Sequence, residues 1–162
     1  PDRTRALLLI DSGPGFKNPE AQARWTTQIE RMGERFETEG MRSLIESRGA
    51  VTAIGRFPES PAARAAAAAI AAQDGAAVAA FGRRVAGPAP CVIDDLARIT
   101  APALVIVGAE DEAYLRASEV LAAKLPRARR VVIPDAGHVV NLEQPEAFDR
   151  AVIEFLRELR TA

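Results

Sequence analysis

The sequence predicts an α/β fold with a partial parallel sheet of three strands and a helical segment inserted after the first strand. Three short apolar runs carry this prediction, at residues 6–10, 103–107 and 130–133, each closed by aspartate, glycine or proline turn residues. Continuous apolar runs of this length are typical of strands buried on both faces. An amphipathic helical pattern follows each of the last two runs, at 112–125 and 144–159, and this alternation is typical of parallel α/β proteins.

Roughly 90 residues separate the first two predicted strands, far more than a simple crossover needs. Their pattern is helical. Asn18 with Pro19, and Ser60 with Pro61, are N-cap and first-turn signals for two helices. Gly75 is expected to end the second of these. The helices predicted in order cover residues 18–40, 41–47 (ending near Gly49), 61–73 and 76–87, with a helical turn at 93–99.

Apolar side chains recur at helical spacing along two of these segments. Trp25, Ile29, Met32 and Phe36 should share one face of the first long helix. Such a stripe indicates either packing between helices or the wall of a substrate pocket. In the last helix, one apolar face is predicted from Phe148, Val152, Phe155, Leu156 and Leu159.

Composition excludes several classes of protein. The 162 residues suit one domain of ordinary size, and 48% are apolar. A net charge of -1 gives no electrostatic basis for binding nucleic acid or an anionic membrane. No apolar stretch reaches the ~20 residues of a bilayer span, and the first residues lack a secretory pattern, so a cytoplasmic protein is expected. The single cysteine, Cys91, excludes an internal disulfide and is interpreted as a small apolar residue rather than a reactive thiol.

The predicted sheet is small for its apolar strands. If the strands lie in chain order, the strand between Ala6 and Ile10 has an open edge, and natural proteins avoid exposed apolar edges. Missing chain, a partner chain or a dimer mate is therefore expected to cover it.

Polar side chains gather where the three predicted strands end. Ligand-binding and catalytic groups of parallel sheets lie beyond the carboxyl ends of the strands. An acid and a histidine can therefore meet there, although roughly 27 residues separate Asp111 from His138, the only histidine. A carboxylate bonded to one imidazole nitrogen fixes the tautomer, and the other nitrogen can act as a general base. The side chains at the three ends are Asp11 and Ser12; Glu110, Asp111 and Glu112; and Asp135, His138, Asn141 and Glu143.

Residues 99–115 and 125–156 resemble the C-terminal end of an α/β-hydrolase. In that family the acid of a Ser-Asp-His triad follows the seventh strand as G-x-x-D, and the histidine follows the eighth strand in a G-H turn. This sequence has Gly108-Ala109-Glu110-Asp111, and Gly137-His138 followed by Asn141-Leu142-Glu143-Gln144-Pro145. Residues 1–16 resemble the sixth strand and its exit. The resemblance thus divides the chain into 1–16 (core strand and exit loop), 17–92 (helical cap, or lid) and 93–162 (C-terminal core).

The departure from the family is the absence of G-x-S-x-G, the nucleophile elbow. The resemblance therefore implies the C-terminal half of a serine hydrolase of esters, lactones or activated C–C bonds. Asp111 and His138 would serve a nucleophilic serine not in this chain, which alone would be inactive. No metal or organic cofactor is implied. The alternative is a catalytically inactive fragment or an assembly module stabilised by dimerisation.

Ser12 and Asp11 are alternative candidates for the nucleophile and the acid. Ser12 has the family order for a nucleophile but precedes Gly13-Pro14-Gly15, a loop rather than an elbow. Asp11 competes with Asp111 as the acid. An apolar acyl or aryl pocket is expected from lid residues Trp25, Ile29, Met32, Phe36 and Phe81. The remaining polar candidates are interpreted structurally: Glu110 and Glu112 as solvated or helix N-terminal charges, Asp135 and Glu143 as turn residues, and Arg83-Arg84 as a solvated face or an anion contact.

Overall fold

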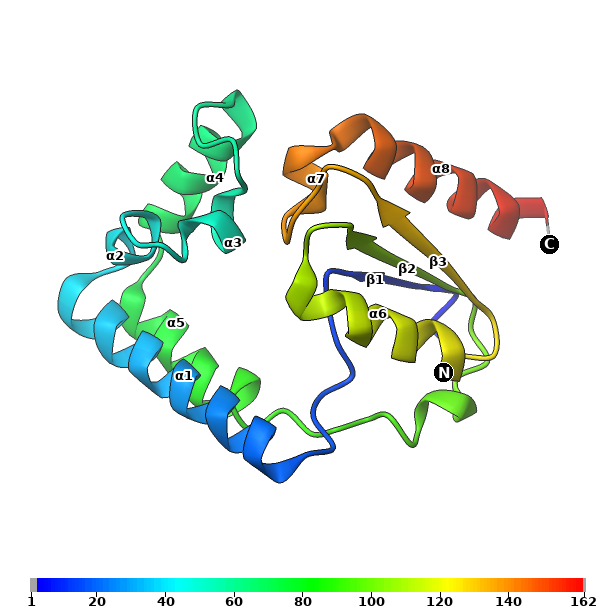
Figure 1. The fold of residues 1–162 in the computed structure, drawn as a ribbon, viewed down its shortest axis with the longest axis horizontal. Coiled ribbons are helices and arrows are strands. Elements are labelled where there is room, and N and C mark those ends of the chain that lie inside the picture. The colour runs from blue at the N-terminus through cyan, green and yellow to red at the C-terminus, as the bar shows by residue number, and fades with distance from the viewer. Residues whose placement is uncertain (1–2, 162) are drawn as a thin grey trace. The chain divides into compact units, whose positions relative to one another are not determined.

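The computed structural model describes residues 3–161, with only the backbone of Thr161. The chain forms two compact units, one of residues 3–14 with 93–161 and the other Gly15–Val92. The first unit holds a three-stranded parallel sheet, ordered β1 (Leu7–Ile10), β2 (Ala103–Gly108) and β3 (Ala128–Ile133) (Figure 1). The predicted fold class is confirmed, and β2 is the central strand.

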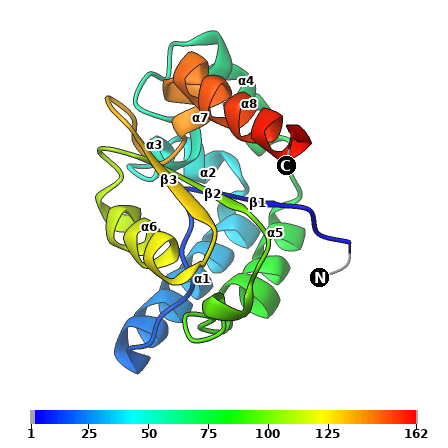
Figure 2. The ribbon, with the colours of Figure 1, turned by 90° about the vertical axis from the view of Figure 1, so that its right-hand side faces the viewer.

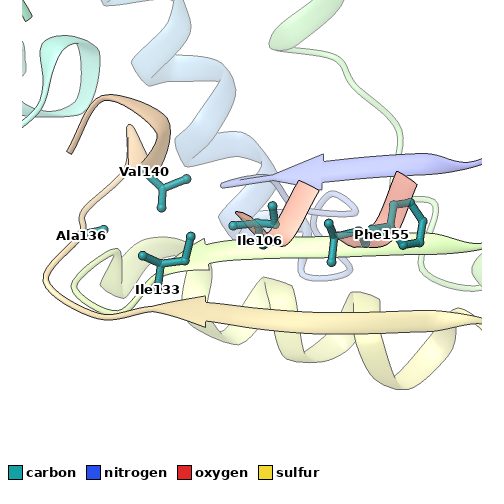
Figure 3. Packing of buried hydrophobic residues seen from close by; sticks show 7 residues of the cluster. Ile106, Ile133, Ala136, Val140 and Phe155 are labelled. Carbon is teal, nitrogen blue, oxygen red and sulfur yellow. The ribbon is translucent and has the colours of Figure 1, made fainter. Parts of the chain in front are cut away.

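Helices cover both faces of this sheet (Figures 1 and 2). On one face lies α6 (Glu112–Lys124). Its Leu121 and the following residue, Leu125, pack against Ala103 and Val105 of β2. On the other lies α8 (Pro145–Thr161), packed with the short α7 (Val140–Glu143) over the alternate residues of the strands. Figure 3 shows this second cluster, with Ile106, Ile133, Ala136, Val140 and Phe155 labelled. A 3₁₀ turn, η2 (Leu96–Arg98), adds Leu96 to the α6 side.

Only β2 is buried on both faces, as its apolar run predicted. For β1 and β3 that prediction is wrong, because Leu8 and Ile10 of β1 remain 42% and 36% exposed and Val132 of β3 remains 39% exposed. The two β1 residues lie level with Leu104 and Ile106 on the α8 face, but neither belongs to the cluster that α8 forms with those two residues. Among residues 3–161, β1 pairs with β2 alone, so its other edge carries no strand.

The apolar face of α8 differs from the predicted one at a single residue. Phe155 is 4% exposed at the centre of the cluster, but Leu156 is 44% exposed. Adjacent helical residues are about 100° apart around the axis, so Leu156 turns away from the face that Phe155 defines. Phe148, Val152 and Leu159 pack against the cluster as predicted.

Replacing Phe155 with alanine is expected to lower the free energy of unfolding by about 3–5 kcal/mol, since it removes a buried ring from a packed cluster. Leu156→Ala is the matched control and should cost less than about 1 kcal/mol. Urea titrations of both variants measure the difference. Equal losses would contradict this assignment of the buried face.

The second unit is helical. Its elements are α1 (Pro19–Glu39), α2 (Arg42–Ile45), α3 (Ala50–Ile54), α4 (Pro61–Ala71), α5 (Gly75–Phe81) and a π-helical turn η1 (Gly82–Ala86). Asn18 and Ser60 cap α1 and α4 through their side chains, as predicted. The helix α3 was not predicted.

Gly75 does not end α4, contrary to the prediction. The helix α4 ends at Ala71, and Gly75 is the first residue of α5, where the Asp74 side chain accepts hydrogen bonds from two backbone N–H groups. A Cβ at Gly75 would overlap the backbone carbonyl of Phe36. Close packing of α5 on α1, which the sequence alone does not reveal, therefore requires this glycine.

Within the described residues, no individual helix has the length and apolar character to cross a bilayer. One sharply bent pair, Pro61–Ala71 with Gly75–Ala86, meets that test by length and composition alone.

Candidate active site

The ends of all three strands contribute polar side chains to one edge of the sheet. Asp11 follows β1, Asp111 follows β2, and His138 follows β3. The strands are parallel, so their carboxyl ends lie together, as the sequence predicted.

The loops after β2 and β3 are tied by backbone contacts. Ala109 N–H donates to the carbonyl of Ile133 at 2.8 Å, and Glu110 N–H donates to that of Ala136 at 2.9 Å. The loops approach so closely at Gly108 that a Cβ there would overlap the carbonyl groups of Ala136 and Gly137. Glycine at the end of β2 is therefore needed for the loops to meet.

Asp111 and His138 form a direct hydrogen bond, with Oδ2 and Nδ1 2.8 Å apart. The Asp111 side chain is 6% exposed and that of His138 is 28% exposed. An ionised carboxylate only accepts hydrogen bonds, so this contact places the proton on Nδ1 and leaves the lone pair on Nε2. Among the described residues, no partner bonds to Nε2. The pair thus has the arrangement of a general base oriented by an acid.

Tyr114 stacks on the imidazole of His138, a contact that sequence analysis missed. The ring centroids are 4.7 Å apart and the planes are inclined by 29°. The Tyr114 N–H donates to the carbonyl of Asp111 at 2.9 Å, so the first turn of α6 positions both the acid and the ring. Burial raises the pKa of Tyr114, and the carboxylates of Asp111 and Asp11 add to the shift. The sequence signal that could have predicted this contact is an aromatic residue three positions after the acid.

Tyr114→Ala is expected to loosen the imidazole, because the His138 ring loses the surface that supports one face. Tyr114→Phe keeps the ring and is the control. The NMR signal of the Nδ1 proton of the only histidine should weaken in the alanine variant and persist in the phenylalanine variant. A persistent signal in both would contradict the role of the stacked ring.

Asp11 is the third carboxyl group at this edge, and it does not bond to His138. Its Oδ1 accepts from Gly108 N–H at 3.1 Å and its Oδ2 from Val140 N–H at 3.3 Å. Burial raises the pKa of Asp11 from 3.8 to about 6; the nearby Asp111 carboxylate adds to the rise, while the two backbone N–H groups and His138 oppose it. By geometry, Asp111 and not Asp11 is the partner of the histidine.

The raised pKa of Asp11 predicts a pH dependence of stability. Between pH 3.8 and about 6 the folded chain holds this proton more tightly than the unfolded chain does. Protonation of Asp11 therefore favours the folded state. This stabilising contribution is fully present below pH 3.8 and is lost as the pH rises through about 6. Urea unfolding across this range should show a stability difference between the original chain and Asp11→Asn that changes with pH. A constant difference would contradict the shift.

The other polar candidates take no part in the Asp111–His138 pair. Ser12 is half-buried, and residues 3–161 show no hydrogen bond between it and His138. Glu110, Glu112 and Asp135 are exposed, and Asp135 has a left-handed backbone with φ 53°. Glu143 is buried and its Oε2 accepts from Gly137 N–H at 3.2 Å, which holds the turn that carries His138.

The predicted pocket residues lie in the helical unit. The Trp25 indole N–H donates to the carbonyl of Ala86 at 2.8 Å, and Ile29 packs against Gly82. Phe36 is buried, Met32 is half-buried and Phe81 is exposed. Three of the five thus pack helices together, and a role for them in substrate binding stays a prediction.

The remaining candidates also lie in this unit. Arg83 forms ion pairs with Glu30 and Glu37, at 2.7 Å and 2.6 Å, while Arg84 is exposed. Cys91 is a half-buried free thiol. The described part of the chain holds no group of three or more His, Cys, Asp and Glu side chains placed to bind a metal ion.

Asp111 and His138 are thus paired at adjacent strand ends of a parallel sheet. Residues 3–151 match the model of the alpha/beta hydrolase family, and the chain belongs to this family. Members of the family act on small molecules.

Among curated proteins, the chain is similar to the putative 2-succinyl-6-hydroxy-2,4-cyclohexadiene-1-carboxylate synthase of Bacillus subtilis (strain 168), with 34% identity over 73 residues. That match covers 45% of this chain and 27% of the relative. Among solved structures, MenH from S. aureus aligns over 96% of this chain and 60% of its own, with TM-score 0.85 and 20% identity. A thermophilic esterase from Thermogutta terrifontis aligns over 98% and 57%, with TM-score 0.82 and 29% identity. The chain thus spans less than two thirds of each of these relatives.

Proposed function

We propose that this chain supplies the acid and the base of a serine hydrolase, and that the nucleophilic serine lies outside this sequence. The observation that carries the proposal is the 2.8 Å hydrogen bond between Asp111 Oδ2 and His138 Nδ1, in a chain of the alpha/beta hydrolase family. The absence of G-x-S-x-G from the sequence supports the second part.

In the proposed reaction, the serine hydroxyl attacks the carbonyl carbon of the substrate while Nε2 of His138 takes its proton. The imidazolium then gives this proton to the leaving group. Asp111 keeps the ring in the required tautomer and stabilises its positive charge. Backbone N–H groups outside this sequence hold the oxyanion. Water repeats the sequence of steps to release the acid.

The proposed substrates are esters, lactones or compounds with an activated C–C bond. The similarity to an esterase at 29% identity supports esters as the first class to test. The relative named as a carboxylate synthase makes carboxylated ring compounds the second class. The helical unit would act as the lid. Met32 and Phe81 are the side chains proposed to face the acyl or aryl group, since Trp25, Ile29 and Phe36 pack helices together.

The proposed partner is the N-terminal half of the same hydrolase. Two observations support it: the chain aligns with only 57–60% of the solved relatives named above, and β1 leaves Leu8 and Ile10 exposed beside an unpaired strand edge. A preceding segment would add further parallel strands at that edge and cover these side chains.

The alternative is an inactive module in which a second copy of the chain covers the same edge. The exposed Leu8 and Ile10 favour it equally. Native mass spectrometry of the purified protein separates the two. A second polypeptide that carries G-x-S-x-G supports the hydrolase, and a dimer of this chain alone supports the module.

A fluorophosphonate probe tests the position of the nucleophile. We expect no covalent labelling of the 162-residue chain by itself. Labelling that disappears in Ser12→Ala would mean that Ser12 is the nucleophile and would overturn the proposal. Labelling of a partner polypeptide, lost on His138→Ala, is the expected result for the assembled enzyme.

A further inference from the structure

The Asp11 carboxylate bridges two segments that are far apart in the sequence. Its Oδ1 accepts from the N–H of Gly108, the last residue of β2, and its Oδ2 from the N–H of Val140, the first residue of α7. Both bonds are buried. Asp11 itself has φ 40°, a left-handed conformation that aspartate tolerates better than most residues.

Each bridged segment carries one member of the Asp111–His138 pair. Gly108 is three residues before Asp111, and its carbonyl accepts from the Asp111 N–H at 3.2 Å. Val140 is two residues after His138. One short side chain therefore bridges the backbone that carries the acid and the backbone that carries the base, in addition to the two backbone bonds between their loops.

The same carboxyl group reduces stability when it is ionised. Burial disfavours its charged form, so the pKa of Asp11 lies at about 6 and ionisation at neutral pH works against folding. The titratable groups that interact with it are Asp111, His138 and Tyr114; Glu143 holds the adjacent turn at Gly137. A buried acid that costs stability indicates a use in the site rather than in the fold.

We propose that Asp11 is a positioning residue whose carboxylate, through the N–H groups of Gly108 and Val140, sets the spacing between Asp111 and His138. We call the two hydrogen bonds that Asp11 accepts from Gly108 and Val140 the Asp11 clamp. The importance of the spacing for proton transfer rests on the proposed function, whereas the clamp does not depend on it. Asp11 acts through the backbone and does not exchange protons with the substrate.

Asp11→Asn tests the clamp. An amide offers one acceptor oxygen, and its NH₂ group would face the second backbone N–H. Amide hydrogen exchange at Gly108 or Val140 should become faster by about tenfold or more, as expected for the loss of a hydrogen bond to a charged group. The Nδ1 proton of His138, bonded to a carboxylate, gives a downfield NMR signal, and this signal should shift or broaden. His138 is the only histidine, so the signal is unambiguous.

Asp135→Asn is the matched control. Asp135 also has a left-handed backbone, with φ 53°, but it is exposed and follows β3. Its replacement should leave exchange at Gly108 and Val140 and the His138 signal unchanged. In the assembled enzyme, Asp11→Asn should lower kcat at least about tenfold with little change in KM, whereas Asp135→Asn should change neither.

Unchanged amide exchange and an unchanged His138 signal in Asp11→Asn would overturn the positioning role and leave the proposed function standing. Absence of the downfield signal from the unmodified chain would contradict the Asp111–His138 bond, and with it both proposals.

If Asp11→Asn does not fold, the unmodified chain is titrated instead. Protection of the Gly108 and Val140 amides, corrected for intrinsic exchange, should fall when the pH is lowered and the Asp11 carboxylate, followed by its carboxyl resonance, takes up a proton. Constant protection would overturn the clamp.

Discussion

Replacing His138 with alanine is expected to lower the turnover of the assembled enzyme by about 10⁴-fold or more, the scale found when a triad member is removed from serine hydrolases. The reason is the loss of Nε2, the group proposed to take the serine proton. The His138 side chain is 28% exposed, so the fold should survive its removal. Ester hydrolysis and circular dichroism, measured on the same preparation, separate the two effects.

Asp111→Asn should produce a comparable loss, because the asparagine amide cannot hold the Nδ1–H tautomer as the carboxylate does at 2.8 Å. Glu110→Gln is the matched control, since it changes an adjacent, exposed acid and should leave turnover unchanged. Near-normal activity in His138→Ala would remove the central claim of the proposed function. If Asp11→Asn lost all activity and Asp111→Asn none, Asp11 would be the acid.

Gly108→Ala is expected to cause a large loss of stability. A Cβ at this position would overlap the backbone carbonyls of Ala136 and Gly137, and backbone atoms cannot move aside as a flexible side chain can. Overpacking at a rigid site costs about 3 kcal/mol or more, and relief requires the β3 exit loop, which carries His138, to shift. Thermal and urea unfolding measure the loss.

Gly13→Ala is the control for that substitution. A Cβ at Gly13 would meet side-chain carbons only, the nearest being Cβ of Ala117 at 3.2 Å. Its cost should be clearly smaller. Similar stabilities for Gly108→Ala and Gly13→Ala would contradict the close approach of the two strand-end loops at Gly108.

The sequence predicted what local signals and chemistry determine. Asn18 and Ser60 are N-caps because their side chains satisfy adjacent N–H groups, which needs no knowledge of the rest of the chain. Asp111 and His138 meet because parallel strands end together.

The features that were missed depend on contacts between distant residues. Position 75 requires glycine because α5 packs closely on Phe36, and Asp11 bridges Gly108 and Val140 across a long separation. Neither contact leaves a periodic pattern in the sequence. Exposure of Leu8 was also missed, because an apolar strand looks the same in the sequence whether or not a neighbour covers it.

The long insertion between β1 and β2 has a consequence for the order of folding. The bond between Asp111 and His138 closes a separation of 27 residues, whereas the bonds from Asp11 close 97 and 129. Closing a longer loop costs more chain entropy, and contacts distant in sequence form more slowly. We therefore expect β2, α6 and β3 to assemble first and to bring the acid to the base. The strand β1 would join last, and Asp11 would then lock an arrangement that has already formed.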